Sequence, residues 1–405
     1  MRVLLLSQYF WPENFQINFI AKLLAERIHL DVFTGKPNYP EGSFYKGHGF
    51  FGVKFEKLFN FTITRIPIFP RKKNRFFLIL NYISFTGIAI FLLPWVMRKN
   101  RYDVIFVYGV SPIYQVIPAI FFGYLRNIPV VLWVQDLWPE SAVHAGKLKS
   151  KILISILKKL VIFCYSRSSL ILVQSEDFVD SVKKLSPNSK VEYHPNTVDE
   201  IFLRNNLSGK FVDKAYSSEF FSVVFAGNIG EAQSIETIVS AAELLAPFSN
   251  IRFVFVGSGS KGEWLRRQIE EKKLTNVEFK GRHPLEEMPL ILESADVLLV
   301  TLKDADAFNK TIPNKIQTYL AIGKPIVGSL NGAGAELIKK SGAGFAAPAQ
   351  DAKSLSDIIL RFSNMNDEEL LNFSQNARCY FENNFEPNFL VDRLLAHFSS
   401  VRKEL

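Results

Sequence analysis

Short apolar runs alternate with stretches of helical spacing along this sequence, and the alternation starts afresh beyond the middle of the chain. Buried strands that alternate with helices are typical of a parallel sheet with helices on both faces. The pattern therefore predicts an α/β protein with two Rossmann-like units whose parallel sheets face each other across a binding cleft. The expected strands are Val3–Ser7, His29–Thr34, Thr62–Ile66, Val104–Tyr108, Val130–Gln135, Leu170–Gln174 and Lys190–Tyr193, then Phe221–Ala226, Arg252–Val256, 276–281, 295–300 and 324–329. In the second unit, helices are expected over 234–246, 262–272, 286–294 and 313–321.

The length of 405 residues also favours two domains, because a single core rarely grows to that size. Residues 203–218 are polar and weakly periodic, as a linker or an exposed loop would be. We therefore predict an N-terminal domain over 1–202 and a C-terminal domain over 203–385. The last segment, 386–405, has helical apolar spacing over Phe389–Phe398 and is expected to pack back on one of the domains.

The net charge of +9 lies almost entirely in the first half of the chain. Within residues 51–100, nine basic residues face a single acidic one, Glu56. Such an imbalance favours contact with an anionic partner: a polyanion, an anionic membrane surface or a phosphate-bearing acceptor. No nucleic-acid-binding motif is present, so we expect no nucleic acid partner. We predict that the basic, Phe-rich stretch Phe50–Phe77 contacts an anionic membrane and a lipid-linked acceptor; the alternative is a solvated basic loop.

A run of 22 residues without charge lies between Arg75 and Arg98 and is long enough to span a bilayer. Asn81, Ser84 and Pro94 interrupt it, so we prefer a buried or interface-seated helix over 76–97 to a true span. The opening MRVLLLSQYFWPE has no small-residue cleavage site and is interpreted as a buried strand. Two cysteines without a motif favour a reducing compartment, and we expect a cytoplasmic protein.

Two glycine-containing turns follow the first two strands of the second unit. GNIG, residues 227–230, and GSGS, residues 257–260, each lead from a strand towards a helix. Glycine lets the backbone approach a ligand closely, and the helix that follows offers free N–H groups to an anion. We therefore predict phosphate binding at Gly227, Asn228, Gly230 and Gly257. An ordinary tight turn between strand and helix is the alternative for each motif taken alone.

A lysine-containing loop precedes the predicted helix over 313–321. Lys310 and Lys315 flank its start, and Pro313 is placed in its first turn. Two ammonium groups beside a helix N-terminus suit a diphosphate whose charge grows as a sugar bond breaks. Solvated lysines at a helix cap are the simpler alternative.

In the first unit, two acidic positions fall where ligands bind in parallel sheets. Asp136, Trp138 and Glu140 follow the strand Val130–Gln135, and Glu13 follows the first strand. Asp136 would orient an acceptor hydroxyl or accept its proton, although an N-cap role explains an Asp there equally well. The sequence lacks a G-x-G-x-x-G fingerprint after its first strand, a P-loop and an H-E-x-x-H motif. Its six histidines do not cluster at metal-ligand spacings, so we predict no metal.

In combination, these motifs resemble glycosyltransferase family 4. The resemblance covers nearly the whole chain and rests on QYFWPE, VLWVQDLWPES, HPNTVD, FAGNIGEAQSIETIVSAAELL, VGSGS, NVEFKGRHPLEEMPLILESADVLLV and IPNKIQTYLAIGKPIVG. Within the family, the chain is most similar to the branch that contains the WbuB-like transferases of bacterial O-antigen and capsule assembly.

The resemblance implies a GT-B fold, a nucleotide-sugar bound by the C-terminal domain, an acceptor bound by the N-terminal domain, retention of configuration, and no required metal or cofactor. It places GNIG at the donor diphosphate, Arg282 near the nucleobase, and the segment from Lys310 through Pro313, Asn314 and Lys315 to Thr318 at the diphosphate and sugar. Many members carry two glutamates eight positions apart in that segment. Here those positions are Lys310 and Thr318, and the N-terminal glycine pair common in the family is replaced by Asn14-Phe15-Gln16.

The resulting hypothesis is a retaining glycosyltransferase at the inner face of the membrane. It would move a UDP-linked N-acetylated or deoxy sugar, such as N-acetyl-fucosamine, onto a lipid-diphosphate-linked saccharide in the assembly of a bacterial surface polysaccharide. Asp136, Lys310 and Lys315 are the expected catalytic residues, and Glu13, Trp138 and Glu140 are expected on the acceptor side. A UDP-sugar epimerase of the same fold and a non-catalytic assembly partner are the alternatives.

Overall fold

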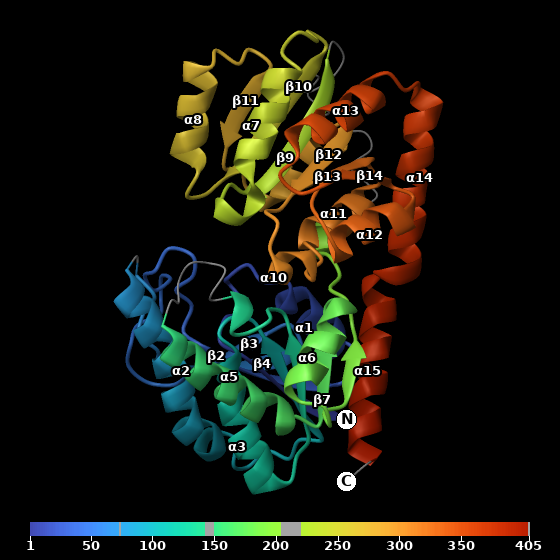
Figure 1. Ribbon diagram of the computed structural model, residues 1–405. Coiled ribbons are helices and arrows are strands. Elements are labelled where there is room, and N and C mark those ends of the chain that lie inside the picture. The colour runs from blue at the N-terminus through green and yellow to red at the C-terminus, as the bar shows by residue number, and fades with distance from the viewer. Residues whose placement is uncertain (73, 142–149, 204–219, 404–405) are drawn as a thin grey trace. The chain divides into compact units, whose positions relative to one another are not determined.

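The computed structural model describes residues 1–72, 74–141, 150–203 and 220–403 (Figure 1). Its contacts divide the chain into two compact units: unit 1 comprises Met1–Pro195 and Pro387–Leu405, and unit 2 comprises Asn196–Glu386. Each unit contains one sheet of mainly parallel strands with helices on both faces. The predicted fold class, with two Rossmann-like domains, is therefore confirmed.

The sheet of unit 1 has its topological switch point at the first strand. Its strands lie in the order β3 (Lys54–Leu58), β4 (Phe61–Ile66), β2 (His29–Gly35), β1 (Arg2–Ser7), β5 (Val104–Gly109), β6 (Val130–Val134), β7 (Leu170–Val173) and β8 (Val191–Tyr193). Only β3 pairs antiparallel with its neighbour. Since β1 lies between β2 and β5, ligands are expected at the carboxyl ends of β1 and β5.

Side chains that alternate along β1 enter two separate cores. Leu4 and Leu6 pack with α2 (Arg75–Val96), α3 (Ile117–Arg126), α5 (Lys151–Ser166) and α6 (Asp177–Leu185). Val3 and Leu5 pack on the opposite face with α1 (Ile17–Ala25) and α15 (Pro387–Lys403). Figure 1 shows α2, α3 and α5 together on one side of this unit. The short helices η1 (Ile113–Val116) and η2 (Glu200–Phe202) complete the described elements up to residue 203.

Unit 2 repeats this layered arrangement around a smaller sheet. Its strands lie in the order β11 (Val277–Gly281), β10 (Ile251–Ser258), β9 (Phe221–Asn228), β12 (Val297–Thr301), β13 (Ile326–Ser329) and β14 (Gly344–Ala347). One face carries α7 (Ile235–Leu244), α8 (Gly262–Glu271) and α13 (Ala352–Ser363), and the other carries α9 (Met288–Glu293), α11 (Asn314–Ile322), α12 (Ala333–Ser341) and α14 (Asp367–Asn384). Three short helices, η4 (Glu231–Gln233), η5 (Leu285–Glu287) and α10 (Asp306–Asn309), lie in connections. Because β9 lies between β10 and β12, the switch point is at the GNIG turn.

The change from unit 1 to unit 2 falls at Asn196 and not at residue 203. The physical reason is that Phe202 packs against the core of unit 2, and the Thr197 hydroxyl donates to the Phe385 carbonyl oxygen at 2.6 Å. Most of the predicted linker, 204–219, lies outside the described residues. The predicted terminal helix is present as α15, and it packs on unit 1 through Leu394 and Phe398.

All predicted strands are present within two residues of their expected ends, but β3 and β14 were not predicted. The sequence of β3, KFEKL, carries three charges, and that of β14, GFAA, has mainly small residues, so neither shows a buried apolar run.

The charge-free run forms α2, which is long and apolar enough to cross a membrane by length and composition, the only such helix in the described part of the chain. One stripe of this helix is buried at intervals of four residues: Asn81, Phe85, Ala89, Leu93 and Met97. The helix also packs against α3 and β4. This packing favours the predicted interface-seated helix over a span.

Candidate functional site

The two glycine turns of unit 2 lie side by side at the carboxyl ends of β9 and β10. In the parallel register, Gly227 is opposite Gly257 and Asn228 is opposite Ser258. The turns are also joined by backbone hydrogen bonds, from Ile229 N to the Ser258 carbonyl and from Lys261 N to the Ile229 carbonyl, both 2.9 Å. The predicted phosphate-binding positions are therefore neighbours in space.

Glycine is required at the point where these turns meet. Gly227 has φ of 122° and Gly257 has φ of 142°, a region that L side chains rarely adopt. A Cβ atom on Gly257 would lie 1.8 Å from the Gly227 carbonyl oxygen, so any side chain there would force the strand ends apart. The glycines thus keep two backbone turns in direct contact.

We expect Gly257→Ala to destabilise unit 2 by about 3 kcal/mol and to weaken binding at the turn, because it adds both backbone strain and overpacking. Gly281→Ala is the matched control: Gly281 also has a positive φ, 74°, but a Cβ atom there would meet no atom within 4 Å. Its expected cost is about 1 kcal/mol. Chemical denaturation of both variants measures the difference, and equal costs would contradict the packing argument.

Lys315, in the first turn of α11, places its ammonium group against the GNIG turn. A Cβ atom on Gly227 would lie 2.9 Å from Lys315 Cε and 3.4 Å from Nζ. The nitrogen lies 3.5 Å from the centroid of the Phe225 ring, a cation–π contact. It is inaccessible to solvent and has no hydrogen-bond partner in the part of the chain that the structure describes. Burial lowers the pKa of Lys315 from 10.5 to about 7. A buried cation without a counterion is costly, and a bound anion would reduce that cost.

The other residues predicted around α11 have different surroundings. Lys310 lies at the end of α10, and its Nζ pairs with Asp306 Oδ2 at 2.8 Å on the exposed surface. Pro313 is the N-cap residue of α11. Asn314 Oδ1 accepts a hydrogen bond from Asn196 Nδ2 at 2.9 Å, and the Thr318 hydroxyl donates to the Asn314 carbonyl at 3.1 Å. Lys315 thus has its ammonium at the glycine turn, whereas the ammonium of Lys310 is engaged with a carboxylate of its own helix.

The other residues predicted on the donor side lie at or just after the carboxyl ends of strands in the same sheet. Asn228 Nδ2 donates to Gln233 Oε1 at 3.2 Å, and Gly230 is the N-cap residue of η4. Arg282 is exposed directly after β11, the strand at one edge of the sheet. Its predicted contact with a nucleobase stays a prediction.

Sequence reasoning missed a charged group beside the glycine turns. Lys261 Nζ pairs with Glu231 and Glu236 at 3.1 and 2.8 Å, and Lys303 Nζ pairs with Glu231 at 3.0 Å. Both lysines follow the carboxyl ends of strands, β10 and β12. Lys261 comes directly after GSGS, and this position could have identified it from the sequence.

In unit 1, Asp136 belongs to a chain of hydrogen bonds at the carboxyl ends of β5 and β6. The Ser111 hydroxyl donates to Asp136 Oδ2 at 2.7 Å, and Trp138 Nε1 donates to Ser111 Oγ at 3.1 Å. Asp136 and Trp138 are therefore joined through Ser111, which sequence reasoning missed. Glu140 is half-buried, and its charge raises the pKa of Tyr165 further beyond the effect of burial.

A second polar group lies beside Asp136 and was also not predicted. Tyr9 and Gln8, which follow β1, both donate to Asn81 Oδ1 of α2, at 3.0 and 2.8 Å. The pKa of Tyr82 is raised by burial, with Arg71 acting in the opposite direction and Asp136 in the same direction. Tyr82 is therefore close to both charges. An Asn inside the charge-free run was a signal for this cluster, since a buried amide needs partners.

The Arg71 guanidinium lies over the Tyr39 ring, with its central carbon 5.1 Å from the ring centroid. No carboxylate pairs with this guanidinium among the described residues. Arg71 thus adds a positive charge, which no described carboxylate pairs with, to the polar side chains near Asp136.

Glu13 has a different role from the one predicted. Its side chain is 1% exposed, and its carboxylate accepts three backbone N–H groups, from Phe10 at 3.1 Å and from Asn38 and Tyr39 at 2.7 Å. Burial raises the pKa of Glu13 to about 7 against the effect of these hydrogen bonds. We assign Glu13 the role of fixing the loop after β2, because both carboxylate oxygens are occupied by the backbone.

Among residues 1–72, 74–141, 150–203 and 220–403, no three His, Cys, Asp or Glu side chains are grouped so that they could hold a metal ion. The cations beside the glycine turns are ammonium groups of the chain itself.

Comparisons with known proteins agree with the division of the chain into two units. The family model described as Glycosyltransferase Family 4 matches residues 13–201, and the model described as Glycosyl transferases group 1 matches residues 221–364. WbjE of Pseudomonas aeruginosa, named as a glycosyltransferase, is 28% identical over 72% of this chain and 74% of its own. WcaI of Escherichia coli K12, named as a colanic acid biosynthesis glycosyl transferase, is 24% identical over 74% of this chain and 75% of its own.

Among solved structures, HepE of Anabaena in complex with UDP is similar over 99% of this chain and 100% of its own, with a TM-score of 0.72 and 15% identity. This likeness supports the GT-B arrangement of strands and helices within the units. The two family models succeed each other along most of the sequence; the first lies almost wholly on unit 1 and the second lies within unit 2. The chain is therefore a glycosyltransferase of GT-B fold, similar to glycosyltransferase family 4 over its N-terminal half and to the glycosyl transferases of group 1 over its C-terminal half.

Proposed function

We propose that this glycosyltransferase takes a sugar from a UDP-linked donor and transfers it, with retention of configuration, to a lipid-diphosphate-linked saccharide. The observation that carries the proposal is the buried ammonium of Lys315, which has no hydrogen-bond partner among the described residues and lies against the GNIG turn. A diphosphate between the turn and Lys315 would receive backbone N–H groups and the missing positive charge. The solved complex of HepE with UDP supports a uridine nucleotide.

The charges of unit 2 support departure of a diphosphate. As the glycosidic bond breaks, negative charge grows on the diphosphate oxygen, and a fixed ammonium stabilises that charge more than the ground state. Lys261 and Lys303 follow the two strands that flank β9, and because Glu231 and Glu236 pair with them, these two lysines add little net positive charge. In this proposal the residues of the chain itself stabilise the leaving group.

The acceptor side of the proposal rests on unit 1. The carboxylate of Asp136 is oriented by Ser111, so it can orient the acceptor hydroxyl, while the departing phosphate takes the proton in a same-face attack. Arg71 supplies a positive charge for the diphosphate of a lipid-linked acceptor. The name of WcaI, from colanic acid biosynthesis, supports a bacterial surface polysaccharide as the product. We place the enzyme at the cytoplasmic face of an anionic membrane, where such acceptors are presented.

A thermal-shift panel of UDP-, GDP- and dTDP-sugars, with N-acetylated and deoxy sugars for each, tests the donor. The matching donor at about a hundred times its Kd should stabilise the protein by about 2.7 kcal/mol, whereas UMP, which lacks the second phosphate, should stabilise it far less. The absence of a shift with every nucleotide diphosphate sugar would overturn the proposal. NMR of the product then tests retention, because an inverted anomeric centre would contradict same-face attack.

A further inference from the structure

Helix α2 has far more apolar surface than unit 1 covers. It is apolar all round, yet only 28% of its most apolar window is buried. A helix of this kind is normally enclosed by protein or by lipid. Beyond the buried stripe from Asn81 to Met97, its remaining faces expose large side chains: Phe76, Ile79, Ile83, Phe91 and Trp95.

The neighbouring helices α3 and α5 continue this apolar surface. Phe121, Tyr124 and Leu125 of α3 are exposed, as are Ile152, Leu153, Ile156 and Phe163 of α5. Together the three helices carry more than half of the exposed large hydrophobic side chains in the described part of the chain. Apolar surface concentrated in this way marks an interaction site, since scattered single side chains would need no explanation.

The surface formed by α2, α3 and α5 carries positive charge and no negative charge. These three helices contain no Asp or Glu, and Asp103 is the only acidic residue between 57 and 135. Exposed basic residues lie along α5 and at the ends of the helices: Arg98, Lys99, Arg126, Lys158, Lys159 and Arg167. Trp95 and Tyr124 lie close to these ends, as aromatic side chains do at a membrane interface. Apolar side chains with a basic border match an anionic bilayer.

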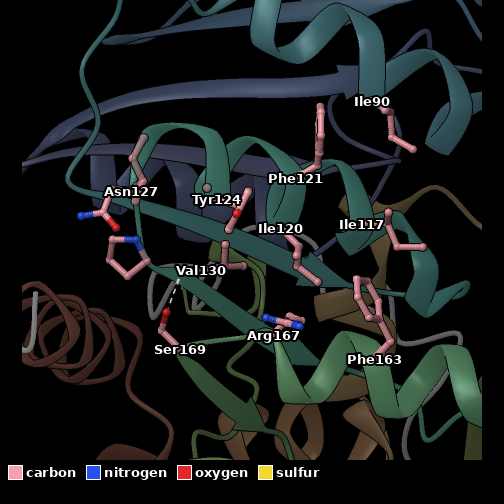
Figure 2. A pocket seen from close by; sticks show the side chains of 13 residues that line it. Ile90, Ile117, Ile120, Phe121, Tyr124, Asn127, Val130, Phe163, Arg167 and Ser169 are labelled. Carbon is pink, nitrogen blue, oxygen red and sulfur yellow. Dashed lines mark hydrogen bonds between the residues drawn. The ribbon is translucent and has the colours of Figure 1, made fainter.

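An apolar groove opens between these helices (Figure 2). It has a volume of about 590 Å³ and is lined by residues of all three helices, among them Ile90, Ile117, Ile120, Phe121, Tyr124 and Phe163. Arg167 is the one cationic residue among the described residues that line the groove. This composition suits a hydrocarbon chain whose anionic headgroup pairs with a guanidinium.

We propose that the surface formed by α2, α3 and α5 inserts into the interfacial layer of an anionic bilayer, with the groove holding an acyl chain of a phospholipid. The inference deepens the proposed function, because a lipid-linked acceptor would then be taken from the same bilayer. Helix α2 connects the two regions: its outer faces would contact lipid, and its residues Asn81 and Tyr82 lie in the polar cluster near Asp136. The stretch Phe50–Phe77, for which membrane contact was predicted, would lie at the edge of this surface, because Phe76 is its first exposed residue along the chain.

Vesicle flotation of the full-length protein tests this surface. We expect binding to vesicles of phosphatidylcholine mixed with phosphatidylglycerol, and weaker binding to phosphatidylcholine alone. Phe91→Glu combined with Tyr124→Glu should lower partitioning by about tenfold or more, because both side chains are exposed, at 79% and 83%, and would meet lipid. Lys158→Gln with Lys159→Gln should lower binding to the anionic vesicles and leave binding to phosphatidylcholine unchanged.

The matched control is Leu371→Glu, which places the same charge at an exposed apolar position, 55% exposed, on α14 of unit 2. It should leave partitioning within about twofold of the wild type. The stabilisation by UDP is measured for every variant, so a failure of the donor site is recorded separately from a failure of membrane binding. Wild-type flotation by the Phe91 and Tyr124 variant would overturn the inference. So would a dimer that this variant converts to a monomer without any change in vesicle binding, because a second copy would then cover the surface.

Discussion

Replacement of Lys315 by Met should lower kcat/KM by about a thousandfold and at the same time raise the melting temperature of the ligand-free protein. The first effect follows from the loss of the ammonium beside the GNIG turn, which is positioned for the charge of the leaving diphosphate. The second follows because the wild-type ammonium is buried and finds no hydrogen-bond partner among residues 1–72, 74–141, 150–203 and 220–403. Met fills a similar volume without that cost. A residue that served the fold alone would not produce these two opposite effects.

The pH dependence of stability provides a second, independent test of Lys315. The pKa of Lys315 is lowered from 10.5 to about 7 in the folded state. Between these values the unfolded chain binds a proton that the folded chain releases, so stability should rise with pH across this interval. Below about pH 7 the full cost of the buried charge is present, about 1.4 kcal/mol for each pH unit that separates the folded and unfolded pKa values. In Lys315→Met this rise should be absent.

Donor binding should also take up a proton. A diphosphate beside Lys315 raises its pKa again, so calorimetry near pH 8 in two buffers of different ionisation enthalpy should record proton uptake by the wild type. Lys315→Arg, which stays charged, should bind without it.

Lys353→Ala removes an exposed lysine paired with Asp357 and controls for a general charge effect. Lys310→Ala should have a small effect, because its ammonium pairs with Asp306. Unchanged turnover in Lys315→Met would remove this residue from the donor site.

The alternation of apolar runs predicted the strands of both sheets because buried parallel strands have a strong and simple signal. The two strands that were not predicted, β3 and β14, show where that signal fails. In β3 the charged side chains lie on an edge strand, where Lys54 pairs with Glu56 of the same strand and Arg65 of β4 pairs with Glu56. Strand β14 has too little apolar volume to stand out from a loop. Whether a segment forms an edge strand depends on the strand beside it, and a short stretch of sequence does not show which strand that is.

The sequence predicted the parts of the site that a single chain segment forms, but not the parts at which distant segments meet. Gly227 and Gly257 could be found because a turn after a strand is a local pattern. Lys310 and Lys315 look alike in sequence, but one ends a short helix beside Asp306 and the other begins α11 beside Gly227. Glu13 was placed on the acceptor side because of its position after β1. Its carboxylate is instead occupied by backbone amides of Asn38 and Tyr39, which are far away along the sequence.

Replacement of Asp136 by Asn should lower kcat by about a hundredfold or more, without a change in donor affinity. Asp136 lies in unit 1, whereas the glycine turns and Lys315 lie in unit 2, so its loss should act on the acceptor step alone. The Asn side chain retains an oxygen that can accept the Ser111 hydroxyl, as Asp136 Oδ2 does at 2.7 Å. The variant therefore removes the charge and keeps the local packing.

Two further variants separate orientation from charge. Ser111→Ala keeps the carboxylate but removes the hydroxyl that orients it and that accepts Trp138 Nε1, so we expect a loss of about tenfold, mainly in kcat. Glu176→Gln neutralises an exposed carboxylate just after β7, the neighbouring strand, and should leave turnover unchanged. Single-turnover transfer with saturating donor measures the step directly. If Asp136→Asn transfers sugar at the wild-type rate, the carboxylate caps a helix and the acceptor hydroxyl is oriented by other groups of the polar cluster, such as Tyr82 or Arg71.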